Sequence, residues 1–247
     1  MSEDKASVPE LTEGQVAKLA TASEVLDLLI RLHDREVDAA FLQGMRDHDL
    51  AGWLSGVLVS QHGQDAAAAL CEALAVDADM DLLAAEYADL YLTHGYRVSP
   101  SGSVWMTEDH LERQLPMFDV REWYDHYDVT VPNWRVRADD HLVHELQFVS
   151  FLCAHGNGVA AADAANFLDQ HVLPWLPEFC RQAAKRVEQP LYAALMALTL
   201  AVLDELRDML AEITGIARNV RVAAPPKAHR EADEEDVAYM PGLAESW

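Results

Sequence analysis

The chain has 247 residues, 51% of them hydrophobic, which is enough for one large folded domain with a sizeable core. Its 42 acidic and 18 basic residues give a formal net charge of −24, which excludes nucleic acid as the natural partner and favours cationic partners. The sequence has no run of about 18 apolar residues, so we expect no membrane-spanning segment. The polar N-terminus, Met1–Lys5, lacks the apolar stretch of a signal peptide, and a cytoplasmic location is therefore expected.

The first third of the chain has the periodicity of amphipathic helices. Apolar residues recur at intervals of three and four, which predicts helices over residues 10–31, 34–45, 50–59, 65–75 and 79–93. Gln61-His62-Gly63 interrupts this pattern and is predicted to be a break between helices.

Residues 94–103 hold two glycines, one proline and three serines, a composition typical of a loop. Val104-Trp105-Met106 follows directly and is expected to be an apolar cluster on that loop. Large apolar residues in a loop either anchor it to the core or form a contact surface for a partner.

The remainder of the chain also favours helices. A helix is expected from Leu111 or Pro116 to Tyr127, followed by an extended connector at 128–137. Glycines at 156 and 215 are predicted to end two of the later helices. These later helices are expected over residues 139–155, 160–171, 173–187 and 190–214.

These elements predict an all-α fold, a single globular bundle of about ten helices, because one extended segment makes no sheet. We expect the folded domain to span residues 1–217 and a flexible acidic tail to follow at 218–247. The three cysteines lie far apart in apolar helical patterns and are expected to be buried, reduced thiols: Cys71, Cys153 and Cys180.

The start of the helix at 139–155 combines two carboxylates with an imidazole. Asp139 or Asp140 is expected to cap this helix by accepting a hydrogen bond from a free N–H of its first turn. His141, His144 and Glu145 follow on a neighbouring face and raise the alternative of a helical metal-binding enzyme. The second histidine of a His-Glu-x-x-His zinc motif is missing, so we expect no metal or cofactor.

Signatures of common enzyme classes are also absent from the sequence. There is no phosphate-binding loop that ends in Gly-Lys-Ser/Thr and no dinucleotide fingerprint after a strand. Neither Ser55 nor Ser101 lies in a strand-turn-helix nucleophile elbow. The chain is therefore not expected to be an enzyme.

Four motifs stand out in the middle and last parts of the chain. They are Gly102-Ser103-Val104-Trp105, Asp140-His141, His171-x-x-Pro174-Trp175 with Phe179, and Pro190-Leu191-Tyr192-x-Ala194-Leu195. In their order and approximate spacing these motifs resemble the TorD/DmsD/NarJ family of cytoplasmic chaperones, and the DmsD branch most closely. The resemblance covers roughly residues 80–210.

The resemblance implies an all-helical chaperone that binds the twin-arginine signal peptide of a molybdopterin-containing oxidoreductase precursor. Such a chaperone assists cofactor insertion and delays export until the enzyme is mature. In that family the aspartate-histidine pair and the loop tryptophan line the peptide site, which corresponds here to Asp140, His141 and Trp105. This chain departs from the family's Pro-x-Asp-His pattern, since Ala138 stands in place of the proline.

The chemistry of a twin-arginine peptide fits these residues, because guanidinium groups beside an apolar segment require carboxylates beside apolar side chains. The carboxylates are expected from Asp139 and Asp140, and the apolar contacts from the loop at 104–106. The full expected peptide site comprises Ser103, Val104, Trp105, Asp139, Asp140 and His141.

An acidic assembly subunit that binds a folded partner is a further alternative. The connector at 128–137 could act as a hinge, so the chain is expected to be a monomer or a domain-swapped dimer.

Overall fold

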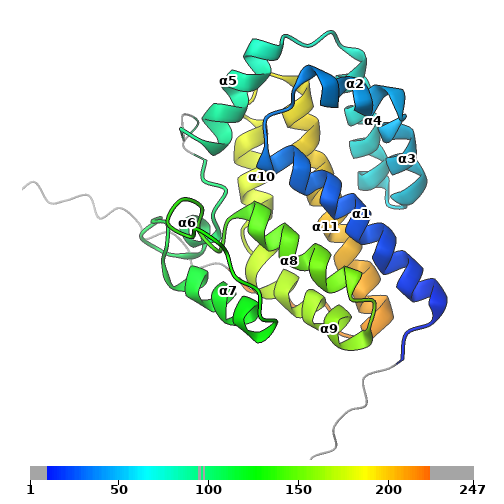
Figure 1. The fold of residues 1–247 in the computed structure, drawn as a ribbon, viewed down its shortest axis with the longest axis vertical. Coiled ribbons are helices and arrows are strands. Elements are labelled where there is room, and N and C mark those ends of the chain that lie inside the picture. The colour runs from blue at the N-terminus through cyan, green and yellow to red at the C-terminus, as the bar shows by residue number, and fades with distance from the viewer. Residues whose placement is uncertain (1–9, 94–95, 97, 223–247) are drawn as a thin grey trace, which may run out of the picture.

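The computed structural model describes residues 10–93, 96 and 98–222, and in these ranges the chain forms helices and no β-strand (Figure 1). This confirms the predicted all-α class. The α-helices are α1 (Glu13–Asp34), α2 (Ala39–Asp47), α3 (Leu50–Val57), α4 (Gln61–Ala75), α5 (Met80–Tyr91), α6 (Gly102–Met106), α7 (Leu115–His126), α8 (Leu142–Ala154), α9 (Gly158–Phe167), α10 (Leu176–Ala184) and α11 (Pro190–Thr214), and a π-helical turn, η1 (Leu168–Val172), follows α9.

The longest helix, α11, joins the two halves of the chain. It packs against α1 and α4 from the N-terminal half and against α9 and α10 from the C-terminal half. The other extensive contact is between α1 and α8, which lie side by side in Figure 1. Because α8 is buried on most of its circumference, its sequence is apolar on nearly every face rather than on one stripe.

Short polar side chains begin most of these helices by accepting hydrogen bonds from free backbone N–H groups. Thr12 and Gln15 form a capping box at α1, and Asn157 caps α9. Gly156 (φ 60°) and Gly215 (φ 74°) adopt the left-handed conformation just past α8 and α11. Both predicted glycine stops are confirmed.

The predicted break at residues 61–63 is wrong, because these residues form the first turn of α4. The Ser60 hydroxyl caps this helix through Gly63 N–H. Glu205 of α11 accepts hydrogen bonds from the backbone N–H groups of Val59 and Ser60, at 2.9 Å each. A contact 145 residues distant in sequence therefore fixes the helix start, and no local pattern reports it.

A buried ion pair fastens η1 to α11. The Arg207 guanidinium donates two hydrogen bonds of 2.8 Å to the Asp169 carboxylate, and Arg207 is completely buried. The same carboxylate accepts Asn219 N–H (2.7 Å), and the Asp169 carbonyl accepts Arg221 N–H (2.8 Å). One aspartate thus binds both the core helix and the segment that follows it.

The predicted tail at 218–247 falls largely outside the described residues, which end at 222, and the division into domain and tail stays a prediction. Of the three free cysteines, Cys153 and Cys180 are buried as expected, but Cys71 is exposed on α4, which corrects that prediction. Burial raises the pKa of the Cys153 thiol to about 12. None of the helices in the described part of the chain is long and apolar enough to cross a membrane.

Candidate functional site

The segment before α6 pairs with the segment before α8. Leu142 N–H donates to the Pro100 carbonyl (2.8 Å), and Gly102 N–H donates to the Asp140 carbonyl (2.9 Å). Ser101 and His141 form an isolated antiparallel bridge between these two bonds. The expectation that the stretch ending in Trp105 lies beside the Asp-His pair is therefore confirmed. Residues 104–106 belong to the short helix α6, not to a loop as predicted.

Asp140 connects the two helices through its side chain. Its Oδ2 accepts the Ser103 backbone N–H at 2.6 Å and the Ser103 hydroxyl at 2.5 Å, so it caps α6 from outside that helix. The predicted role of Asp139 or Asp140 as the cap of α8 is wrong, since the His141 Nδ1 accepts Val143 N–H (3.1 Å) in that position. The physical reason is that both carboxylates are bonded to other elements.

The Asp140 carboxyl is completely buried, and its Oδ1 has no hydrogen-bond partner among the described residues. Burial raises its pKa above the ordinary value, although the bonds from Ser103 oppose this. Asp140 therefore lies beneath the surface and holds α6 against α8.

Asp139 is also almost fully buried, and it pairs with a side chain that reaches the surface. It accepts Arg121 at 2.7 Å, and 30% of the Arg121 side chain is exposed against 4% of Asp139. The Arg121 guanidinium also lies over the rings of Phe118 and Trp134, at 5.3 and 5.1 Å. A buried carboxylate, a half-exposed cation and two aromatic rings thus meet at α7.

The three residues of the metal-site alternative do not converge. His141 caps α8, whereas the His144 Nδ1 bonds to the Ala138 carbonyl (2.8 Å). Glu145 is buried with both carboxylate oxygens unpaired among the described residues. Across the described part of the chain, no group of three or more His, Cys, Asp or Glu could hold a metal ion, which contradicts that alternative.

Ala138, which replaces the family's proline, is buried. Its carbonyl accepts the His141 backbone N–H (3.2 Å) as well as the His144 ring. A proline has the same carbonyl, so the departure from the family pattern leaves these two acceptor contacts unchanged.

Glu145 lies among residues of the other motifs. Burial raises its pKa well above the ordinary value, the charge of Asp140 adds to this, and the Trp175 indole opposes it to a smaller extent. Gly102 packs on that indole so closely that an added Cβ would lie 3.0 Å from Trp175 Nε1. Trp105 meets Phe179 edge-to-face, with 6.5 Å between ring centroids. Three of the four motifs on which the resemblance depends therefore meet in one interior region.

The side chains that were expected to make apolar contacts with a peptide point largely into the protein. Val104 and Trp105 are only partly exposed, and the Trp105 indole donates to the Ser99 carbonyl (2.8 Å). Ser103, Asp140 and His141 are buried. The structure brings the six predicted site residues together as a scaffold and exposes little of it.

The neighbouring surface, which no motif of the sequence predicted, exposes several large apolar side chains. Arg113 donates to the Arg135 carbonyl (2.9 Å) and so joins the segment before α7 to the connector at 128–137. Large apolar side chains are exposed on these two segments and on α7: Leu111 (57%), Leu115 (68%), Phe118 (48%) and Val136 (78%). We call these four residues the apolar rim. One sequence signal could have revealed this rim. Leu111 and Leu115 lie among charged residues and do not belong to the apolar stripe of a predicted helix.

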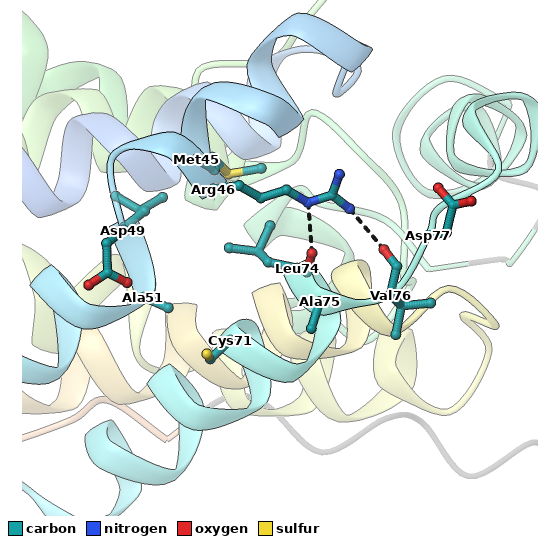
Figure 2. Close-up of a pocket in the computed structure, with 10 residues that line it drawn as sticks. Met45, Arg46, Asp49, Ala51, Cys71, Leu74, Ala75, Val76 and Asp77 are labelled. Atoms are coloured by element: carbon teal, nitrogen blue, oxygen red, sulfur yellow. Dashed lines mark hydrogen bonds between the residues drawn. The ribbon is translucent and has the colours of Figure 1, made fainter.

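A separate depression of about 470 Å³ lies between α2, α3 and the end of α4 (Figure 2). Arg46 crosses it and donates to the carbonyls of Leu74 (2.7 Å) and Val76 (2.8 Å). Its guanidinium thereby satisfies the free carbonyls at the C-terminus of α4. This depression is the junction of three helices, and Cys71 is part of its lining.

Comparison with known proteins agrees with the family resemblance. Residues 59–181 match the family model described as "Nitrate reductase delta subunit". This match and the relatives below support the TorD/NarJ family. The helical fold and the meeting of the family motifs at α6 and α8 agree with this assignment.

Three relatives illustrate the TorD/DmsD/NarJ match. "Chaperone protein TorD" of Vibrio cholerae is 29% identical over 146 residues, 56% of this chain and 66% of that protein. The TorD protein of Vibrio vulnificus is 25% identical over 193 residues, 72% of this chain and 89% of the relative. The "Selenate reductase assembly chaperone protein" of Thauera selenatis is 27% identical over 111 residues, 41% and 58% of the two chains. The match thus spans just under two thirds of the Vibrio cholerae relative.

These relatives are named as chaperones, in agreement with the prediction that the chain is not an enzyme. The narrower assignment to the DmsD branch is not confirmed by them and stays a prediction.

Proposed function

We propose that this protein is a chaperone for the assembly of a reductase, and that it binds the precursor of a molybdopterin-containing oxidoreductase in the cytoplasm. The relatives named as chaperones, one of them for selenate reductase assembly, support the general role. The proposed ligand is the precursor's twin-arginine signal peptide, and binding delays export until cofactor insertion is complete.

The observation that carries this proposal is the apolar rim beside Asp139 and Arg121. Its four exposed side chains offer a contact surface to the apolar segment of a signal peptide. The almost fully buried Asp139 carboxylate fixes the Arg121 guanidinium beside Phe118 of the rim through their ion pair. Asp140, Ser103 and His141 support this surface from beneath, because they fix α6 against α8.

Isothermal titration of the full chain with a synthetic peptide tests this proposal. The peptide has a Ser-Arg-Arg core followed by an apolar segment, and its counterpart carries Gln-Gln instead of Arg-Arg. We expect the double variant Leu115→Ala/Phe118→Ala to bind the arginine peptide roughly tenfold more weakly, which corresponds to about 1.4 kcal/mol. The Gln-Gln peptide should bind the unaltered protein more weakly for lack of guanidinium groups.

Leu82→Ala is the matched control, since Leu82 is 53% exposed on α5, away from the apolar rim. It should leave the affinity unchanged. Equal affinity for the two peptides, or no binding of either, would overturn the proposed function. An equal loss in the Leu82 variant would overturn the proposed surface.

A further inference from the structure

A polar groove of about 510 Å³ lies on the side of α7 opposite to Arg121, the residue that pairs with Asp139. One face of α7 lines it with residues spaced by three and four positions. α9, η1 and the segment after α11 complete it. Its lining includes Asp119, Glu122, Trp123, Asp163, His171 and Arg221.

The groove carries an excess of negative charge. Asp119, Glu122 and Asp163 contribute three carboxylates, against the single guanidinium of Arg221. Asp163 also accepts the Tyr127 hydroxyl at 2.5 Å, which fixes the position of its carboxylate. Trp123 also lines the groove and packs edge-to-face on Phe167, with 5.8 Å between centroids. Carboxylates around an indole form a suitable environment for a cation.

An independent feature of the groove is His171. Its side chain is 3% exposed, and its Nδ1 has no hydrogen-bond partner among the described residues. Burial, together with the charge of Arg221, lowers the pKa of this imidazole to about 4, so it is neutral at pH 7. A neutral imidazole retains an acceptor nitrogen, and an unpaired buried acceptor is unfavourable. A hydrogen-bond donor that enters the groove can bond to the His171 Nδ1 in the tautomer that leaves this nitrogen unprotonated.

The cation already in the groove comes from the chain itself and is held loosely. The Arg221 Nη1 lies 3.8 Å from Asp119 Oδ2, and 53% of the Arg221 side chain is exposed. Such exposed pairs contribute little to stability. The backbone of this segment is fixed instead by Asp169, through Asn219 N–H and Arg221 N–H. The guanidinium can leave the groove without undocking the segment.

We propose that this groove binds an arginine side chain of a basic peptide, and that Arg221 occupies the place of that guanidinium in the free protein. Guanidinium is preferred to ammonium because its planar fork matches several carboxylates and stacks on an indole. The identity of the peptide, the twin-arginine segment of a precursor, rests on the proposed function. The groove would hold one arginine while the apolar rim contacts the segment that follows.

The test uses the full chain and the short peptide acetyl-Ser-Arg-Arg-Ala-amide, which lacks the apolar segment and so reports on arginine binding alone. Binding is followed by the NMR signal of the Trp123 indole N–H, assigned by its loss in Trp123→Phe. We expect Asp119→Asn/Glu122→Gln to bind roughly tenfold more weakly, through loss of two charges. Arg221→Ala should bind about threefold more tightly, because the internal competitor is gone.

Charge-matched controls separate this site from general attraction to an acidic protein. Glu24→Gln/Glu72→Gln removes two exposed carboxylates elsewhere, and Lys185→Ala removes one exposed cation. Both should leave the affinity unchanged. Circular dichroism checks that every variant is folded.

Equal affinities in the groove variants and their controls would overturn the inference, as would a Lys-Lys peptide that binds as tightly. A chain that binds the long signal-type peptide but shows no groove effect would retain the proposed function and lose this inference. The opposite result is also possible: the short peptide binds in the groove, but the long peptide binds no better than its Gln-Gln form. That result would retain this inference and overturn the proposed function.

Discussion

At the scale of single residues, Glu145 is the least expected feature of the molecule. From the sequence, a carboxylate in the first turn of a helix is expected to be exposed and to interact favourably with the positive end of the helix dipole. The structure instead buries it, with the neighbouring Asp140 charge adding to the rise in its pKa. The folded state therefore favours its protonated form.

The sign of the resulting pH dependence follows from linkage. A carboxyl whose folded pKa is raised binds its proton more tightly in the folded protein, so its contribution to stability is present below the unfolded pKa of about 4.5 and is lost as pH rises through the folded value. We expect Glu145→Gln to raise the free energy of unfolding at pH 8, and the gain to shrink toward pH 5. Each pKa unit corresponds to about 1.4 kcal/mol. Urea unfolding at several pH values measures this, and a pH-independent loss of stability in the variant would contradict it.

At the scale of elements, the joint between α6 and α8 depends on one carboxyl. We expect Asp140→Ala to lower the free energy of unfolding by about 2–3 kcal/mol, because the Ser103 N–H and hydroxyl lose their buried acceptor. Asp140→Asn keeps an acceptor for Ser103 and should cost less than about 1 kcal/mol. Urea unfolding of both variants measures the difference. Equal losses of stability in the two variants would mean that the negative charge of Asp140, rather than its hydrogen bonds to Ser103, stabilises the joint.

The helices themselves were largely predictable from the sequence, since apolar periodicity and the glycines at 156 and 215 are local signals. The exact helix starts were not. Asp140 caps α6 across 37 residues, and Glu205 fixes the start of α4 across 145. Such distant partners decide which of several adjacent polar residues acts as the cap. The apolar rim escaped prediction for a related reason, because only the tertiary arrangement shows which apolar residues remain uncovered.

At the scale of the whole molecule, the net charge of −24 leaves the folded chain with strong internal repulsion. Raising NaCl from about 0.05 M to about 0.5 M screens this repulsion, so we expect the melting temperature to rise by roughly 2–4 °C at pH 7.5. The increase should disappear near the sequence pI of about 4.6, where the net charge vanishes. Differential scanning calorimetry measures both conditions. An equal rise near the pI would point to a general salt effect instead.

The packing of α1 and α11 shows that residues 59–181, the stretch matched by the family model, depend on helices outside that stretch. The stretch matched by the family model, residues 59–181, contains α8 and α4 but neither α1, which lies along α8, nor α11, which lies along α4. Excised alone, that stretch would present the covered faces of both helices to solvent. We therefore expect residues 59–181 alone not to fold as a stable unit, because helices on either side of this stretch complete its core.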